Sequence, residues 1–240
     1  MNETHHTTQY TITPLGIIHS CFGEKFAVPR QPGLVPSAKG YIELLPPYNH
    51  PDIVDGLEDC SHIWVQFLFH QCLDRGWQMK VRPPRLGGNK KMGVLATRAT
   101  HRPNGLGMSV VRLTSIETTH DSVRLHIQGL DLVDGTPVVD IKPYVPYADS
   151  ITDAYYPFAQ EKPDVVDVYF QTAAEQQLTL AATDVETRKW LRQLIIEVLQ
   201  QDPKPAFHQP SPDREYGAKL GGHNVKWRYL NQRIEVTAIE

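Results

Sequence analysis

The chain has 240 residues, 40% of them hydrophobic and 21% charged, and its formal net charge is −3. This composition is ordinary for a globular protein, and the length allows one large domain or a main domain with a smaller one. An isoelectric point near 6.4 excludes a protein that is basic throughout, so any binding of nucleic acid must depend on a local patch.

The three cysteines, Cys21, Cys60 and Cys72, are far apart and form no C-x-x-C pair. This argues against a disulfide framework and a structural zinc site, and we expect no metal. The polar residues 1–9 have no apolar segment typical of a secretory signal, and no apolar run approaches the ~20 residues of a membrane span. We therefore expect a cytoplasmic protein that does not contact a membrane.

Short strands separated by turn signals dominate the first 140 residues. Residues 10–20 read as a first strand, and residues 61–69, rich in aromatic and β-branched side chains, read as a largely buried one. Further strands are expected at residues 92–96, 109–117, 123–128 and 138–141. No helical periodicity lies between them, which favours an antiparallel sheet or barrel over a parallel sheet.

The composition changes after Pro143. Residues 142–164, which include Pro143, hold four prolines and scattered aromatic residues, as expected for a linker or an arm laid across a surface. A strand is expected at residues 165–170, and Thr183 and Glu186 have the spacing of a helix capping box. The helix behind this box has an apolar face of Trp190, Leu191, Leu194, Ile195, Val198 and Leu199.

This helix should end at Asp202-Pro203, because proline cannot continue a helix. Residues 224–229 and 233–239 read as a closing hairpin joined at Asn231-Gln232. The chain is therefore predicted to be mainly β, with an N-terminal unit over residues 10–150 and a small α+β domain over residues 151–240.

Positive charge is concentrated between Arg75 and Arg102. This segment holds eight of the 24 lysines and arginines and no aspartate or glutamate. Phosphate backbones are the commonest ligands of such a basic segment, because lysine and arginine neutralise phosphates and release counterions. The alternative is a solvated face with no ligand.

Common catalytic motifs are absent from the sequence. It has no G-x-S-x-G, H-E-x-x-H or P-loop sequence, and no G-x-G-x-x-G after a strand. A Rossmann-type site for a nucleotide or methyl donor is therefore not expected. A small-molecule hydrolase is disfavoured as well, because no set of nucleophile and base or of metal ligands can be named.

Two polar segments stand out before the basic one. Arg30 and Gln31 lie between Pro29 and Pro32, and prolines can hold a donor side chain in place for a ligand, although a rigid turn alone would look the same. His70 and its neighbour Gln71 follow the buried strand, where polar ligand groups often lie, although a core histidine is the alternative.

Two more segments follow. Arg98 and Arg102 precede the turn-forming Pro103-Asn104-Gly105, whose backbone N–H groups can bind an anion or a purine edge. Residues 130–143, LDLVDGTPVVDIKP, place carboxylates in an otherwise apolar strand–turn–strand, which costs desolvation unless they are paired or functional. The alternative is that Asp134 only caps a tight turn.

Taken together, these segments resemble a known family. FAVPRQPGL, FHQ, KVRPPRLGG, MGVLATR, RPN followed by GMS, and LDLVDGTPVVDIKPY are similar to the TsaA-like family, specifically its TrmO-type members, over roughly residues 11–150. Two later segments, 201–206 and 224–228, resemble the second domain of the same subfamily.

The resemblance implies an S-adenosylmethionine-dependent tRNA methyltransferase. Such an enzyme methylates N6 of N6-threonylcarbamoyladenosine at position 37, beside the anticodon. The implied fold is a single-sheeted antiparallel β-barrel with a small α+β domain, and the implied assembly is a homodimer that binds the donor near its interface. The implied donor-binding residues are Pro29, Arg30, Gln31, His70, Gln71, Arg98, Met108, Asp134, Gly135, Thr136 and Pro137.

The implied chemistry leaves the catalytic residue open. A base near the acceptor nitrogen would help, and both His70 and Asp134 are candidates. The tRNA anticodon stem-loop would follow the basic residues Lys80, Arg82, Arg85, Lys90, Lys91 and Arg102. Gly105 replaces a proline that is usual in the family, and we expect it to loosen the turn. The alternative function is a non-catalytic RNA- or nucleotide-binding β-barrel.

Overall fold

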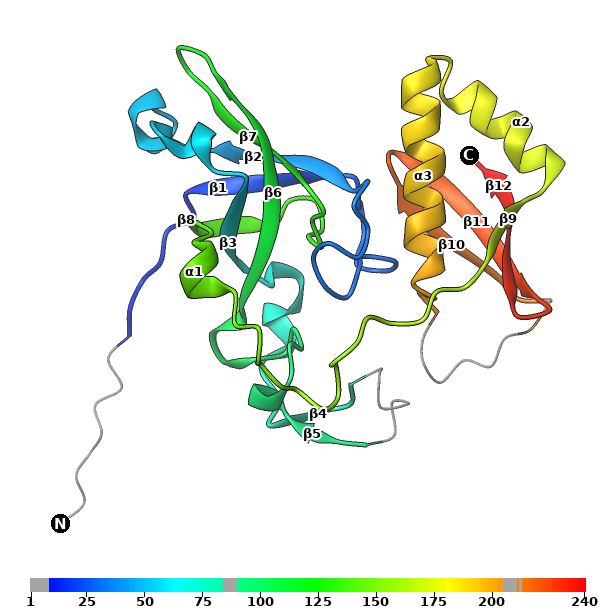
Figure 1. The fold of residues 1–240 in the computed structure, drawn as a ribbon, viewed down its shortest axis with the longest axis horizontal. Helices are drawn as coiled ribbons and strands as arrows, with labels where there is room; N and C mark the ends of the chain where they lie inside the picture. The colour runs from blue at the N-terminus through cyan, green and yellow to red at the C-terminus, as the bar shows by residue number, and fades with distance from the viewer. Residues whose placement is uncertain (1–8, 84–89, 205–210, 212) are drawn as a thin grey trace.

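The computed structural model describes residues 9–83, 90–204, 211 and 213–240. Six antiparallel strands close into a barrel in the order β1-β2-β7-β6-β3-β8 (Figure 1). Their bounds are β1 Gly16–Ser20, β2 Lys39–Leu44, β3 His62–Leu68, β6 Leu106–Thr118, β7 Val123–Gln128 and β8 Pro137–Pro143. The predicted mainly β fold with an antiparallel barrel is confirmed.

Alternation of buried and exposed side chains places the barrel core. In β3, Ile63, Val65 and Phe67 are buried between less buried neighbours, and in β7 every second residue from Val123 is buried. Strand β6 pairs with β3 on one side and β7 on the other. Because the sheet closes on itself, these strands leave no open edge.

Some predicted strands are shorter than expected. Only the last five residues of the segment 10–20 form β1. The segment 92–96 splits into β5 Met92–Gly93, paired with β4 Lys80–Val81, and the 3₁₀ helix η5 Val94–Ala96. Strand β2 was not predicted. The other 3₁₀ helices are η1 Pro51–Val54, η2 Leu57–Asp59, η3 His70–Arg75 and η6 Pro103–Gly105.

The C-terminal unit is a four-stranded sheet packed with two helices (Figure 1). Its strand order is β10-β11-β12-β9, and β9 is parallel to β12. The expected hairpin is confirmed, since Asn231 and Gln232 join β11 to β12 with positive φ angles of 48° and 65°. The strand bounds are β9 Val168–Phe170, β10 Glu215–Leu220, β11 His223–Leu230 and β12 Arg233–Ile239.

Helix α3, Val185–Gln200, buries the expected apolar face against this sheet. The predicted cap was one residue off, because the side chain of Asp184, rather than Thr183, accepts the N–H of Thr187 at 2.7 Å. Helix α2, Thr172–Ala181, was not predicted. Helix α1, Pro146–Asp149, is a single turn at the start of the linker.

The loop of residues 21–38, here called the proline loop, packs against the C-terminal unit. The backbone of Ser37 makes two bonds to α3: its N–H donates to Glu197 at 2.8 Å, and its carbonyl accepts from the Trp190 indole at 2.9 Å. The ring of Phe26 stacks on Trp227 of β11 with ring centres 5.9 Å apart. One hydrophobic core therefore runs through both units. The domain boundary near residue 150 stays a prediction.

Candidate functional site

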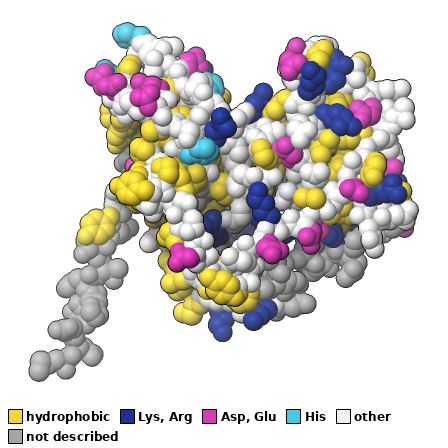
Figure 2. All heavy atoms as spheres, in the orientation of Figure 1, with side chains coloured by type: hydrophobic (Ala, Val, Ile, Leu, Met, Phe, Trp, Pro, Cys, Tyr) yellow, Lys and Arg dark blue, Asp and Glu magenta, His cyan; other side chains and the backbone are white. Residues whose placement is uncertain are grey.

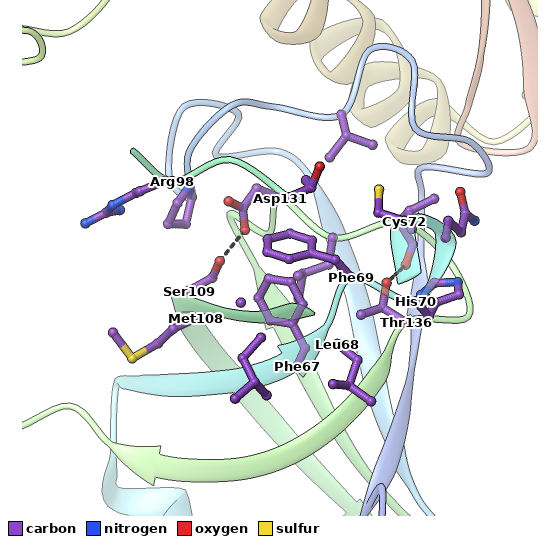
Figure 3. A pocket seen from close by; sticks show the side chains of 18 of the residues that line it. Phe67, Leu68, Phe69, His70, Cys72, Arg98, Met108, Ser109, Asp131 and Thr136 are labelled. Atoms are coloured by element: carbon purple, nitrogen blue, oxygen red, sulfur yellow. Dashed lines mark hydrogen bonds between the residues drawn. The ribbon is translucent and has the colours of Figure 1, made fainter. Parts of the chain in front are cut away.

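A cavity of about 730 Å³ opens beside the barrel, within the usual range for a small-molecule site. Its wall combines the proline loop, the end of β3 with η3, residues 98–102, the start of β6 and residues 131–136 (Figure 3). Eight of the predicted donor-binding residues lie in this wall: Pro29, Arg30, Gln31, His70, Gln71, Arg98, Met108 and Thr136.

One side of the cavity is polar and positively charged. The Arg98 guanidinium donates to the side-chain oxygen of Gln31 at 2.6 Å, which joins the basic segment to the proline loop. Pro29 is buried and Arg30 is exposed, and both line the cavity. Two guanidinium groups in one wall suit an anionic group such as a carboxylate or phosphate.

The opposite side begins with η3. His70 is half-buried at its first position, immediately after Phe69, and Gln71 follows (Figure 3). The ammonium of Lys25 donates to the carbonyl of Gln71 at 2.8 Å, which fixes this short helix against the proline loop. The predicted side chains at the end of β3 are therefore in the cavity wall, as expected for a ligand site.

Aromatic rings form the floor between these two sides (Figure 3). Phe67 and Phe69 meet edge to face with ring centres 5.1 Å apart. Gly107 lies against them, and a Cβ atom at this position would be 2.4 Å from the Phe67 ring. Glycine is thus required for β6 to approach the rings. The floor provides an apolar surface of the kind that binds a purine.

The Asp134 turn lies mostly outside the cavity. Asp134 is exposed, and its carboxylate accepts the N–H of Ser20 at 2.8 Å. Gly135 supplies a φ of 75°, and Pro137 starts β8. Among these four residues, Thr136 alone lines the cavity. The geometry corresponds to the tight-turn alternative for Asp134, whose roles in donor binding and catalysis stay predictions.

The sequence reasoning did not single out a second carboxylate, Asp131. It is half-buried in the cavity wall and accepts the hydroxyl of Ser109 at 2.6 Å (Figure 3). Burial raises the pKa of Asp131 to about 6, against the smaller opposing effects of Ser109 and the positive charge of Arg98. From sequence, the carboxylates of residues 130–143 were expected to cost desolvation unless they are paired or functional. That argument does not show which aspartate faces the cavity.

The predicted RNA-binding residues divide into two groups. Lys80, Arg82, Lys90 and Lys91 are exposed around the β4–β5 pair, and Arg85 lies outside the described residues. Arg102 is half-buried in the cavity wall instead, and its guanidinium donates to the carbonyl of Thr97 at 2.9 Å. Its environment differs from that of the exposed lysines.

The turn at Gly105 is well defined. Asn104 and Gly105 both adopt left-handed conformations, with φ of 64° and 61°. The N–H of Gly105 donates to the carbonyl of Arg102 at 3.0 Å, and its own carbonyl accepts from Phe69 at 2.8 Å. Proline can adopt neither this φ nor this donor role. A proline at position 105 could therefore not form the turn seen here, and the expected loosening of the turn stays a prediction.

The part of the chain that the structure describes holds neither a metal-ligand cluster nor a helix able to span a membrane. No three His, Cys, Asp or Glu side chains among these residues come together as a metal site would require. Among the helices of the same part of the chain, none has the length and apolar character needed to cross a bilayer.

Comparison with known proteins assigns both units of the chain to one family. The N-terminal domain of tRNA-methyltransferase O matches residues 17–150, and the TrmO C-terminal domain matches residues 163–240. The chain belongs to the TrmO family. A crystal structure of TrmO from Pseudomonas aeruginosa superposes with a TM-score of 0.81 at 41% identity, covering 97% of this chain and 99% of that one. The TrmO resemblance and the fold expected from it are thereby confirmed.

Two relatives carry functional names. A tRNA (adenine(37)-N6)-methyltransferase of Escherichia coli is 48% identical over 236 residues, which are 97% of this chain and 99% of the relative. RcsF of Pseudomonas aeruginosa carries the name of an S-adenosylmethionine-dependent methyltransferase. It is 50% identical over 220 residues, which are 92% of this chain and 93% of that protein. A second TrmO crystal structure gives a TM-score of 0.80 at 44% identity, with 97% and 99% coverage.

Proposed function

We propose that this protein transfers a methyl group from S-adenosylmethionine to N6 of adenosine 37 in tRNA, and that its substrate is the threonylcarbamoylated form of that adenosine. The observation that carries the proposal is the cavity, in which eight of the donor-binding residues implied by the family resemblance meet. The family membership and the names of nearly full-length relatives support the same reaction.

The residues of the cavity fit this methyl donor. The guanidinium groups of Arg30 and Arg98, with the amide of Gln31, would hold its carboxylate. The rings of Phe67 and Phe69 would contact adenine. When bound, the donor supplies a methyl group already activated on a sulfonium. Much of the remaining work is positioning, which the short bond between Gln31 and Arg98 serves by ordering the polar wall.

The acceptor would reach the cavity from the basic β4–β5 region. Lys90 lies 5.4 Å above the ring of Phe158, and the Tyr156 hydroxyl donates to the carbonyl of Ala96 at 2.7 Å, so the linker lies beside this region. Figure 2 shows lysine and arginine side chains along the hollow between the two units and at the lower edge of this face. Such charges can follow the phosphates of an anticodon stem-loop, whose unstacked bases are open to chemistry.

Two further features belong to the proposal. The protein would act as a homodimer, which light scattering on the purified protein would test. It would work in the cytoplasm, where tRNA is modified, and fluorescence microscopy of a tagged chain would test this.

The decisive experiment is a transfer assay with labelled S-adenosylmethionine. Two preparations of the same tRNA are compared, one with and one without the threonylcarbamoyl group. Label on the modified tRNA alone is the expected result. Transfer to neither, with donor binding still measured by calorimetry, would instead favour the non-catalytic nucleotide-binding barrel.

A further inference from the structure

Asp131 occupies an unusual position in the cavity. Among the described residues it is the only carboxylate that lines the wall. One of its oxygens, Oδ1, accepts the hydroxyl of Ser109, which is itself buried on β6. The neighbouring Leu130 and Leu132 are fully buried, so the carboxylate is set in an apolar part of the loop between β7 and β8. A carboxylate placed in this way is poorly solvated.

The ionisable groups around Asp131 allow it to act as a proton acceptor. Arg98 is the charged group that acts on it, and the other ionisable residues of the wall are Lys25, Arg30, His70, Cys72 and Arg102. Burial outweighs the opposing effects of Ser109 and Arg98, and the resulting pKa of about 6 lies close to neutral pH. A base with a pKa near the working pH is the most effective, because it is deprotonated yet still basic.

The proposed reaction needs such a base. The acceptor nitrogen is conjugated to the carbonyl of the threonylcarbamoyl group, so its electron pair is available for bonding only as its proton leaves. Of the two bases considered from sequence, Asp134 is exposed and bonded to Ser20 outside the cavity. His70 lies on the other side of the Phe69 ring from Asp131 (Figure 3).

We propose that Asp131 is the catalytic base that takes the N6 proton of the acceptor adenosine, with Ser109 as its positioning residue. This inference rests on the proposed function. As the N6–H bond breaks, the proton goes to Oδ2 of Asp131, the carboxylate oxygen that does not accept from Ser109. The electron pair left on nitrogen forms the bond to the methyl group. The methyl–sulfur bond breaks at the same time, its pair stays on sulfur, and the sulfonium becomes a neutral thioether.

The test compares the wild type with Asp131→Asn under single-turnover conditions. Transfer from labelled S-adenosylmethionine to threonylcarbamoylated tRNA should fall by ~10²–10⁴-fold in the variant. Donor affinity measured by calorimetry should change by less than about threefold, because Asp131 acts on the acceptor. In the wild type, the transfer rate should fall at low pH as Asp131 becomes protonated. This acidic limb of the plot of rate against pH should be absent from the variant. Asp153→Asn, which removes an exposed linker carboxylate, is the matched control.

A second readout does not depend on turnover. The side-chain carboxyl of Asp131 is titrated by carbon NMR in the free protein, with Asp131→Asn used to assign the signal. Ser109→Ala should move this titration to higher pH, because it removes the hydrogen bond that favours the charged form. The acidic limb of the rate profile should move in the same direction.

Several outcomes would overturn the inference. Donor binding weakened more than about tenfold in Asp131→Asn, with an unchanged rate at saturating donor, would make Asp131 a donor ligand instead. An unchanged transfer rate and pH profile in a folded variant would exclude it as the base. If the wild type itself methylates no tRNA, the proposed function fails and the inference fails with it, so the two failures are distinguishable.

Discussion

Replacing Asp131 by asparagine should change how the stability of the protein depends on pH. In the folded protein the pKa of Asp131 is raised to about 6, whereas an aspartate in an unfolded chain titrates near ~3.9. The folded state therefore binds this proton more tightly. The stability that this provides is fully present below the unfolded pKa and is lost as pH rises through about 6. A difference of about two pKa units corresponds to about 3 kcal/mol of unfolding free energy.

The assay is urea unfolding of the wild type and Asp131→Asn at intervals from about pH 4 to about pH 7.5. The asparagine variant lacks this titration. Its unfolding free energy minus that of the wild type should therefore rise by about 2.4 kcal/mol across this range, because at about pH 4 half of the unfolded chains have already lost this proton. The control Asp153→Asn reports the effect of losing one charge from the exposed linker. A difference that stays constant with pH would show that Asp131 is not held in a desolvated site, and would refute the reasoning.

Three further predictions concern RNA binding, the turn and the core. Lys90→Glu with Lys91→Glu should weaken tRNA binding and reduce its salt slope by about 1 per residue, with donor binding unchanged; equal tRNA affinity in filter binding would contradict it. Gly105→Ala should cost about 1–3 kcal/mol of stability, because its φ is +61° and a Cβ would lie 2.4 Å from a leucine methyl group; an unchanged melting temperature would count against this. Leu194→Ala, at a fully buried position of α3, should cost ~2–5 kcal/mol, whereas Leu180→Ala, 79% exposed, should cost little; similar urea midpoints for both would exclude this packing.

The sequence predicted best those elements whose own pattern reports their burial. Strand β7 alternates cleanly, β3 is rich in aromatic and β-branched residues, and α3 has a continuous apolar face, so all three were found. Helix α2 was missed because only Ala174 and Leu178 of its residues are buried, which leaves little periodicity to read. Strand β5 was predicted too long, because its apolar residues continue into the 3₁₀ turn of η5.

The candidate site also has residues that local sequence could identify and one that it could not. Arg30, Gln31 and Arg98 were singled out from local sequence, and the structure places them in one wall. The inward side chain of the segment 130–137 could not be chosen in that way. Asp131 and Asp134 are three residues apart in one motif, and which of them faces the cavity depends on how the turn packs against Ser20 and Ser109. That information belongs to tertiary structure.

The proline loop has a consequence for how this protein can evolve. One face of the loop forms the cavity wall, while the backbone of Ser37 at its end is bound on both sides by Glu197 and Trp190 of α3. A mutation in α3 can thus alter ligand binding without any contact with the ligand. Such a mutation would be selected on two effects, its effect on helix packing and its effect on the shape of the cavity. The C-terminal unit and the cavity are therefore free to diverge only together.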